Sequence, residues 1–415
     1  MSVLYTLAIR VFGLLAWVAA RFKRTARLWV EGRRHWHRRL VADIKESEDL
    51  VWFHAASLGE FEQGRPIIEK VREAYPGHPI LLTFFSPSGY EVRKDYDGAD
   101  YVHYLPLDTP ENAKKFLESA QPKLAVFIRY EYWYNFLRAM FRRDIPVVMA
   151  SAIFRKGQVF FKPYGGWTRE TLRGISHFFV QNQESLELLD TIGIRNKTLS
   201  GDTRFDRVWD AAQEKRAFPL VERFIADKLC LMAGSTWPFD DQLLKEIVPA
   251  FPDLKFVIVP HHVDEANIRR ITDLFEGLVA LYSRGGDQDL VAKQVLVVDT
   301  IGMLTHLYRL ADLAYVGDGF GAGIHSILEP AAFGMPIFFG PNYQNFQEAV
   351  DLVERKGVFA VGDQEELTQV IRRFADDERA RREVGQVCRD YIEEKRGATD
   401  SVMMGLRKFL GEPTA

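Results

Sequence analysis

The sequence predicts an α/β protein with two doubly wound domains, and three observations support this. The chain has 415 residues, which is more than a single hydrophobic core usually accommodates. From residue 50 onward, short apolar runs alternate with stretches of helical periodicity, which indicates parallel sheets covered by helices. A charged stretch with few strand formers, 203–222, divides this alternation into two series. We therefore expect two domains that face each other across a cleft, with ligands at the carboxyl ends of the strands.

The candidate strands are apolar runs of four or five residues. In the first series they are Val51–His54, Ile80–Phe84, Tyr101–Tyr104, Leu124–Phe127, Val147–Ala150 and His177–Val180. In the second series they are Leu229–Ala233, Lys255–Val259, Val295–Val298, Leu313–Val316 and Pro336–Phe339. The expected divisions are an N-terminal helix with a basic segment (1–40), a first domain (41–205), a linker (206–222), a second domain (223–395) and a C-terminal helix (396–415) that could pack back on the first domain.

The N-terminal segment predicts contact with a membrane. It reads MSVLYTLAIRVFGLLAWVAARFKR and is apolar except for Arg10, while the uninterrupted run Val11–Ala20 is short for a full span. A secretory signal would place its positive charge before the apolar core. Here residues 1–40 hold nine lysines and arginines against one acid, and most of them follow the apolar run. We expect a helix on an anionic membrane surface with the following chain in the cytoplasm; the alternative is a helix packed on the protein with a solvated basic face.

The rest of the composition excludes little. The chain is 47% apolar and 27% charged, and its net charge of −3 gives no indication of a nucleic-acid partner. The two cysteines provide no disulfide framework and fit a reducing compartment.

A phosphate site is predicted in the second series by YVGDGFGAGIHSILEP, residues 315–330. A strand is followed by four alternating glycines, then by His325 and Ser326, and then by a helix that carries Glu329. Glycines let the backbone approach a ligand, and a helix N-terminus presents free N–H groups. Ser326 would be an N-cap or a phosphate donor, and Glu329 would bind ribose hydroxyls. The glycines formally fit a dinucleotide fingerprint, but no acid follows the next strand to bind an NAD ribose.

Polar residues also follow three other strands of the second series. A metal held by His261, His262 and Asp264 is a weaker alternative there, because adjacent histidines in an extended chain point apart. The carboxyl ends of parallel strands meet at one edge of a sheet, so we expect these residues to line one site. The residues that follow these three strands are Ser235 and Thr236, then His261 and His262, and then Asp299, Thr300 and Gly302.

The first series places one acid at a comparable position. HAASLGEFEQGRP, residues 54–66, reads as strand, small-residue turn and helix, with Glu60 directly after Gly59. An acid in the first turn of a helix is a common surface choice, so the residues alone leave a capping role and a functional role open.

Further candidates in the first series follow later strands. Asp95 and Asp97 could pair at a metal, but a solvated loop is the better interpretation because no strand leads into them. Arg155, Lys156 and Lys162 alternate with phenylalanines, which indicates either a surface loop or a site for a phosphorylated amphiphile. The strand-end residues are Ser86, Ser88 and Gly89 in TFFSPSGYE, and Arg129 and Glu131 in AVFIRYEYWYN.

Taken together, these motifs resemble the Kdo transferases, which transfer 3-deoxy-D-manno-oct-2-ulosonic acid (Kdo) from CMP-Kdo to a lipid A precursor. The matching segments are HAASLGE, SPSGYE, YEYWYN, GDTRFD, GST, VPHH, DTIGML and GIHSILEPAAFGMPIFFGPNYQNFQE, in that order. The resemblance runs from the N-terminal helix to about residue 395. It implies a GT-B fold, inversion at the sugar carbon, no metal or other cofactor, and a monotopic enzyme on the cytoplasmic face of a Gram-negative inner membrane.

The resemblance also implies roles for individual residues, which we combine with the strand-end candidates. Glu60 would be the catalytic base. The acceptor would be bound by Ser57, Gly59, Ser86, Ser88, Gly89, Arg129, Glu131, Arg155 and Lys162. The CMP-sugar would be bound by Ser235, Thr236, His261, His262, Gly302, Met303, Gly323, His325, Ser326, Glu329, Asn345 and Glu348.

The chain departs from the family pattern at three of these places. Many members have Glu-Thr-Glu where this chain has Arg129-Tyr130-Glu131, Arg-His at His261-His262, and His-Asn at His325-Ser326. The alternatives are a GT-B enzyme that uses a UDP-sugar and another lipid acceptor, and a membrane-bound sugar-nucleotide binder without activity.

Overall fold

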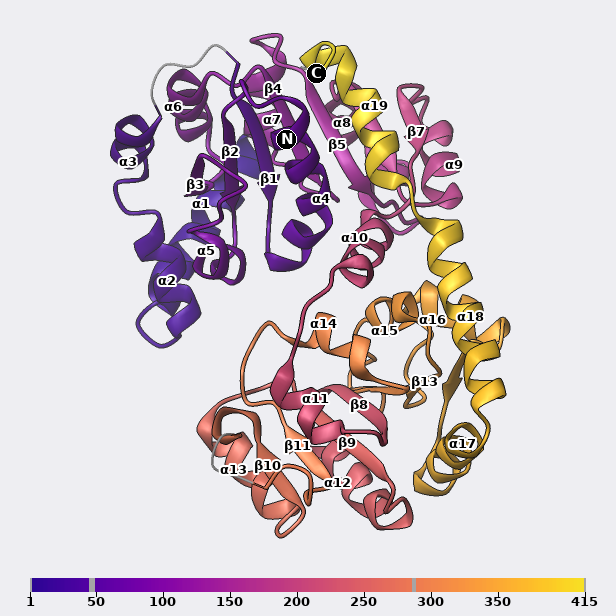
Figure 1. Ribbon diagram of the computed structural model, residues 1–415. Coiled ribbons are helices and arrows are strands. Elements are labelled where there is room, and N and C mark those ends of the chain that lie inside the picture. The colour runs from indigo at the N-terminus through magenta and orange to yellow at the C-terminus, as the bar shows by residue number, and fades with distance from the viewer. Residues whose placement is uncertain (1, 45–48, 286–288, 414–415) are drawn as a thin grey trace. The chain divides into compact units, whose positions relative to one another are not determined.

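The computed structural model describes residues 2–44, 49–285 and 289–413, and it divides into two compact units (Figure 1). Unit 1 comprises Met1–Asp206 and Arg396–Ala415, and unit 2 comprises Arg207–Lys395. Each unit contains one parallel seven-stranded sheet with helices packed on it. This confirms the predicted α/β, doubly wound class.

The sheet of unit 1 has the order β3-β2-β1-β4-β5-β6-β7. Its central strands are buried on both faces, which is why they read as continuous apolar runs in the sequence. Within β1, Trp52 packs into the core on one face, while Val51 and Phe53 pack into the core on the other. The strands are β1 (Val51–Ala55), β2 (Ile80–Phe84), β3 (Tyr101–Tyr104), β4 (Leu124–Ile128), β5 (Val147–Ala152), β6 (His177–Val180) and β7 (Lys197–Leu199).

Helices cover both faces of this sheet. One core includes residues of α3 (Trp36–Asp43), α6 (Pro110–Ala120), α7 (Tyr134–Phe141), α8 (Gly166–Arg173) and α9 (Gln183–Thr191). The opposite core includes residues of α4 (Leu58–Ala74) and α19 (Ala398–Leu410), with Tyr90 of α5 (Pro87–Arg93) packed against it. A short 3-10 turn, η1 (Val159–Phe161), precedes α8.

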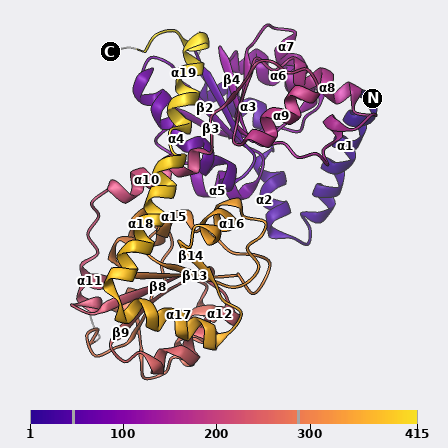
Figure 2. The same cartoon turned by 90° about the vertical axis from the view of Figure 1, so that its right-hand side faces the viewer.

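The N-terminal helix lies on unit 1 with its apolar side outward. Helix α1 (Ser2–Ala19) is followed by α2 (Arg24–Gly32), with which it packs (Figure 2). The Tyr5 hydroxyl donates to Asp108 at 2.7 Å, and Asn135 donates to the Thr6 hydroxyl at 3.3 Å. The opposite face exposes an apolar stripe of 42–78% exposed side chains, Val3, Leu7, Val11, Leu14 and Val18.

By length and composition alone, α1 could cross a membrane, since its mean hydropathy is 1.8 and none of its residues is buried. Its packing against unit 1 on one side and its apolar stripe on the other also suit a helix that lies along a membrane surface. Arg10, which interrupts the apolar run, pairs with Glu111 of α6 at 2.9 Å.

Unit 2 repeats the architecture with the strand order β10-β11-β9-β8-β12-β13-β14. Helices α12, α13 and α17 pack on one face of its sheet, and α18 packs against both α15 and α16. The strands are β8 (Leu229–Thr236), β9 (Leu254–Pro260), β10 (Val279–Leu281), β11 (Val295–Val297), β12 (Leu313–Val316), β13 (Ile337–Phe339) and β14 (Val358–Ala360). The helices are α11 (Pro219–Ile225), α12 (Pro238–Ile247), α13 (Glu265–Leu274), α14 (Leu304–Leu307), α15 (Leu328–Phe333), α16 (Gln347–Glu354), α17 (Gln364–Asp376) and α18 (Glu378–Lys395), with 3-10 turns η2 (Val248–Ala250), η3 (Tyr282–Arg284) and η4 (Tyr308–Leu310).

The last helix of the chain is fixed to unit 1 by one carboxylate. Asp206, in α10 (Thr203–Gln213), accepts hydrogen bonds from the backbone N–H groups of Gly397 and Thr399 and from the Thr399 hydroxyl. These are N–H groups that the first turn of α19 leaves without a helical partner. Val402, Leu406 and Leu410 then place the helix in the core against α4 (Figure 1).

We expect Asp206→Ala to destabilise unit 1 by about 2–3 kcal/mol, because hydrogen bonds to a charged acceptor are worth more than neutral ones and the N–H groups lose their partner. Urea unfolding should report the loss, and limited proteolysis should cleave the α19 segment faster. Asp400→Ala, an exposed acid on the same helix, is the control and should change stability by about 0.5 kcal/mol or less. Equal stability of Asp206→Ala and the parent would contradict the role of this carboxylate.

Candidate functional site

In unit 1, Glu60 lies at the carboxyl end of β1, in the first turn of α4. Its side chain is almost buried, with 10% exposed. The Ser57 hydroxyl donates a short hydrogen bond to the carboxylate. A side chain added at Gly59 would meet only the Ser57 hydroxyl, at 3.8 Å. The acid therefore borders open space on the Gly59 side and is held in orientation by its own helix turn.

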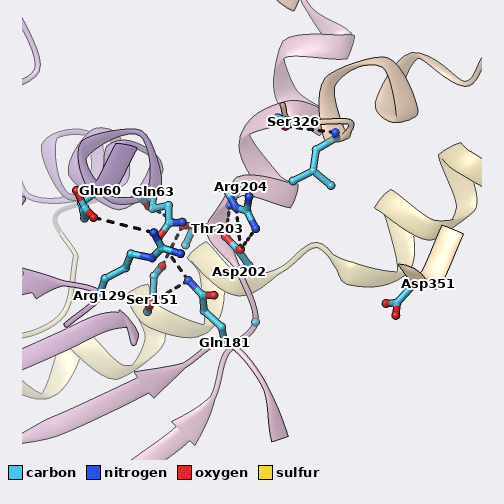
Figure 3. Close-up of polar contacts among 12 residues, drawn as sticks. Glu60, Gln63, Arg129, Ser151, Gln181, Asp202, Thr203, Arg204, Ser326 and Asp351 are labelled. Carbon is cyan, nitrogen blue, oxygen red and sulfur yellow. Dashed lines mark hydrogen bonds and ion pairs between the residues drawn. The ribbon is translucent and has the colours of Figure 1, made fainter. Parts of the chain in front are cut away.

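Arg129 is the cation beside Glu60. Its Nη1 lies 4.0 Å from Oε1 of the carboxylate, and Figure 3 shows the guanidinium extending toward Glu60. The backbone of Arg129 is left-handed, with φ of 67°, a conformation that costs a non-glycine residue about 1 kcal/mol or more. Its N–H donates to the Ala150 carbonyl at 2.8 Å, which holds this conformation at the end of β4. The arginine that departs from the family pattern thus faces the predicted base.

The buried histidine of β1, His54, lies between the sheet and Glu131, the second acid among the unit 1 candidates. His54 Nδ1 lies 2.9 Å from the Thr83 hydroxyl and 3.1 Å from the Thr83 carbonyl, and its Nε2 accepts from the Trp133 indole N–H at 3.0 Å. The same Nε2 lies 3.6 Å from the Glu131 carboxylate. These partners favour the Nδ1–H tautomer. Sequence analysis missed His54 and Trp133, although His54 is the first residue of the HAASLGE motif.

The serines after β2 form a local turn. Ser86 is the N-cap of α5, where its hydroxyl accepts from the Ser88 N–H at 3.2 Å and contacts the Ser88 hydroxyl at 3.0 Å. The Ser86 N–H donates to the Ala56 carbonyl at 2.6 Å, so this turn lies beside the Ser57–Glu60 turn. Gly89 has another role, because an added side chain there would meet the Phe84 ring at 2.2 Å. The glycine makes room for the core.

The basic loop after β5 is not joined to Glu60 among the described residues. Arg155 is exposed and Lys162 is half-buried, and neither side chain forms a hydrogen bond or ion pair with the acid. A second network missed in the sequence lies at the end of the same strand, where the Thr203 hydroxyl donates to the Gln63 carbonyl at 2.5 Å and contacts the Ser151 hydroxyl at 3.1 Å (Figure 3). This network joins α4 to β5 and to the start of α10.

In unit 2, four aromatic rings gather at the carboxyl ends of β8 and β9 and at the loop after β12. His261 stacks on Trp237 with ring centroids 5.0 Å apart, and on His325 with centroids 4.6 Å apart. His262 meets both His261 and Trp237 edge-on, so the two adjacent histidines do not point apart as expected. The chain turns after β9 ends at Pro260, which brings both rings to one side. Sequence analysis missed Trp237.

The Trp237 indole N–H donates to Nε2 of His325 at 3.1 Å, which leaves Nδ1 of that ring to carry the proton. Burial lowers the pKa of His261, and the neighbouring His325 and His262 lower it further, against an opposing contribution from Asp318. Burial likewise lowers the pKa of His325, while Asp318 and Asp240 act to raise it. Both rings are therefore neutral at pH 7 until an anion approaches them.

The glycine-rich loop differs from the expected phosphate seat in two respects. An added side chain at Gly317 would meet the Ser235 carbonyl oxygen at 2.3 Å, so this glycine lets two loops pass close together. The following helix, α15, begins at Leu328 with Ile327 as its N-cap and is only six residues long. Ser326 is thus not the N-cap. It accepts from the Leu328 N–H at 3.3 Å and donates to Glu329.

The remaining candidates lie at neighbouring loops of unit 2. Ser235 has a left-handed backbone with φ of 54°, and Thr236 is buried. Gly302, with φ of 86°, precedes Met303 at the N-cap of α14. Gly323 has a φ of 136°, which strains other residues, and a side chain added there would crowd the Phe346 ring. Asn345 is exposed, and Glu348 lies buried in the first turn of α16.

The weaker metal alternative finds no support among the described residues, where no group of three His, Cys, Asp or Glu side chains could hold an ion. Asp264 instead caps α13, accepting from the Asn267 N–H at 3.1 Å. Asp95 and Asp97 line a surface cavity of about 420 Å³ together with Arg65 and Arg93.

Several known proteins are similar to this chain in sequence or in fold. A family model described as 3-deoxy-D-manno-octulosonic-acid transferase (kdotransferase) matches residues 34–207. A 3-deoxy-D-manno-octulosonic acid transferase of Haemophilus influenzae is 27% identical over 378 residues, covering 87% of both chains. One of Aquifex aeolicus is 28% identical over 331 residues, covering 78% of this chain and 85% of the relative.

Among solved structures, UDP-GlcNAc 2-epimerase of Neisseria meningitidis bound to UDP-GlcNAc has a TM-score of 0.62 at 16% identity, covering 87% of this chain and all of that one. A putative UDP-N-acetylglucosamine 2-epimerase of Listeria monocytogenes has a TM-score of 0.60 at 12% identity, covering 89% of this chain and all of that one. At such identities the likeness shows the fold, which is of the expected GT-B class.

The histidine cluster predicts how the affinity for CMP, the nucleotide that the resemblance implies, depends on pH. Since both rings are neutral near pH 7 and an anion favours their protonated forms, CMP should bind more tightly as pH falls below about 7, by up to about tenfold per pH unit. Isothermal titration between acidic and mildly alkaline pH measures this. His261→Arg should flatten the profile because its charge is constant, and comparison with the parent cancels the titration of the phosphate itself. Parallel profiles for the two proteins would refute this interpretation.

Proposed function

Because the chain belongs to the Kdo transferase family of glycosyltransferases, we propose that it transfers Kdo from CMP-Kdo to a lipid A precursor of the lipid IVA type. The family supports a Kdo glycosyltransferase of lipopolysaccharide synthesis. The donor, the acceptor and the roles of individual residues are the proposal, and the observation that carries it is the environment of Glu60.

Glu60 is proposed to be the base that activates the acceptor. A sugar hydroxyl is a poor nucleophile until its proton is removed in the transition state, and a carboxylate in hydrogen-bond reach can accept it. Glu60 has the required features: a nearly buried carboxylate, an orienting hydrogen bond from Ser57, and open space at Gly59. The Arg129 guanidinium lies 4.0 Å from the carboxylate.

The proposed reaction is an inverting displacement at the anomeric carbon of Kdo. The acceptor oxygen forms a bond to the anomeric carbon of Kdo as its proton passes to Glu60, and the bond from that carbon to the CMP phosphate oxygen breaks. The electron pair leaves with CMP. We propose that the cluster of His261, His262 and His325 binds the phosphate, since imidazole N–H groups can donate to it and gain charge as it binds.

Glu131 and the basic loop are proposed to bind the acceptor. Glu131 lies next to His54 at the end of the same strand as Arg129, and Arg129 could contact a phosphate of the acceptor as well as Glu60. Arg155 and Lys162 remain candidates for this contact, since the loop that holds them follows the next strand, β5. We also propose that the reaction needs no metal.

The place of action is proposed to be the cytoplasmic face of the inner membrane in a Gram-negative bacterium. The exposed apolar stripe of α1 supports contact with a bilayer, and the arginines and lysines of the following residues suit anionic headgroups. A lipid acceptor would then reach the enzyme from the surface on which α1 lies.

Glu60→Gln should lower kcat by about 10²- to 10⁴-fold, because the amide keeps the shape of the side chain but cannot accept the proton. Purified protein, CMP-Kdo and lipid IVA provide the assay, with products identified by mass spectrometry. Glu69→Gln, on the same helix and half exposed, is the matched control and should turn over normally. Near-parental turnover by Glu60→Gln would exclude the proposed base.

Binding separates the alternatives. Both Glu60→Gln and the parent should gain more thermal stability from CMP than from UDP or GDP. The substitution should not change this preference, because the proposed nucleotide site lies in unit 2 and Glu60 lies in unit 1. Preferential stabilisation by UDP would favour a UDP-sugar transferase. CMP binding with no release of CMP from CMP-Kdo in the presence of acceptor would favour a binder without activity.

A further inference from the structure

A cavity of about 560 Å³ opens on the surface of unit 1 between α1, α6 and α7. Five cationic side chains line it, and no acidic side chain among the described residues does. The cations come from all three helices: Arg10 from α1, Lys114 from α6, and Arg138, Arg142 and Arg143 from or just after α7. None of them belongs to the candidate site around Glu60.

The α1 wall of the cavity also carries exposed apolar side chains. Val3 and Leu7 of α1 line it and are 78% and 56% exposed. Both belong to the outward stripe of α1, so the cavity opens onto the same surface as the stripe. Helix α1 is fixed in place as this wall, since Tyr5 and Thr6 are hydrogen-bonded to Asp108 and Asn135.

The cationic charge is only partly neutralised. Arg10 pairs with Glu111 at 2.9 Å, and Arg143 pairs with Glu118 at 3.7 Å. Lys114 shares the same Glu118 oxygen at 3.8 Å.

Two of the arginines form no ion pair among the described residues. Arg138 donates to the neutral Tyr134 hydroxyl at 2.8 Å, and Arg142 is exposed and forms no ion pair among the described residues. Arg138 and Arg142 are therefore available to an incoming anion.

We propose that this cavity binds the phosphate headgroup of an anionic phospholipid in the membrane on which α1 lies. The chemistry fits a lipid better than a soluble anion, because exposed aliphatic side chains of α1 line the cavity beside the cations. A headgroup phosphate would contact Arg138 and Arg142, while the acyl chains would follow Val3 and Leu7 into the bilayer. The inference rests on the proposed membrane association but not on the transferase chemistry.

Vesicle flotation tests the site with the full-length protein. Vesicles of phosphatidylcholine containing phosphatidylglycerol should bind the parent, and Arg138→Gln/Arg142→Gln should lower the partition coefficient about 25-fold, since each cation at an anionic surface contributes about fivefold. Binding to pure phosphatidylcholine should not change. Arg379→Gln/Arg382→Gln, which removes the same charge from exposed positions on α18, should leave both values unchanged. Equal losses in the two double variants would overturn the proposal.

A soluble probe distinguishes a pocket from diffuse attraction. Dihexanoyl phosphatidylglycerol below its micelle concentration should bind the parent saturably, with one site per chain, and the single variant Arg142→Gln should weaken this without affecting folding. Inorganic phosphate that binds as tightly would show a simple anion site and refute a lipid site, as would absence of saturable binding. Transfer to detergent-dispersed acceptor should be unchanged in both arginine variants, so failure of this site is separable from failure of the proposed function.

Discussion

Buried carboxylates that accept backbone N–H groups hold the loops on which the candidate sites depend. In unit 2, Asp240 accepts from the Trp237 and Asp318 N–H groups at 2.8 and 3.0 Å and from the Tyr315 hydroxyl at 2.7 Å. Burial raises the pKa of this acid, while the hydrogen bonds oppose the shift. In unit 1, Asp108 accepts hydrogen bonds from the backbone N–H groups of Asn135 and Phe136 at 3.0 and 2.9 Å. Without these acceptors, buried N–H groups at strand ends would lack partners, at a cost of about 1–3 kcal/mol each.

The same acids connect distant parts of each unit. Asp108 binds both the start of α7 and Tyr5 of α1, so these two helices share one anchor. Asp240 joins the loop that carries Trp237 to the glycine-rich loop, and this contact brings His325 against His261. The loops that carry Trp237 and His325 are therefore held together by an acid that takes no direct part in the proposed chemistry.

The sequence predicted the central strands well because they are buried on both faces and form continuous apolar runs. It missed β7, β10 and β14, which are three-residue strands at the edges of the sheets and too short to show a pattern. It placed Glu60 correctly in the first turn of a helix. It could not find His54 or Trp237, because a buried histidine and a tryptophan near proline look like core residues until the fold pairs them. The expectation that His261 and His262 point apart was wrong because both residues lie beyond the end of the strand, which is at Pro260.

The return of α19 to unit 1 has a consequence for biosynthesis. The core of α4 is completed by Val402, Leu406 and Leu410, which are translated after every residue of unit 2. Domains usually fold in the order in which they leave the ribosome. Here unit 1 cannot complete this core until α19 has been translated, so the side chains of α4 that α19 covers lack these partners throughout synthesis of unit 2.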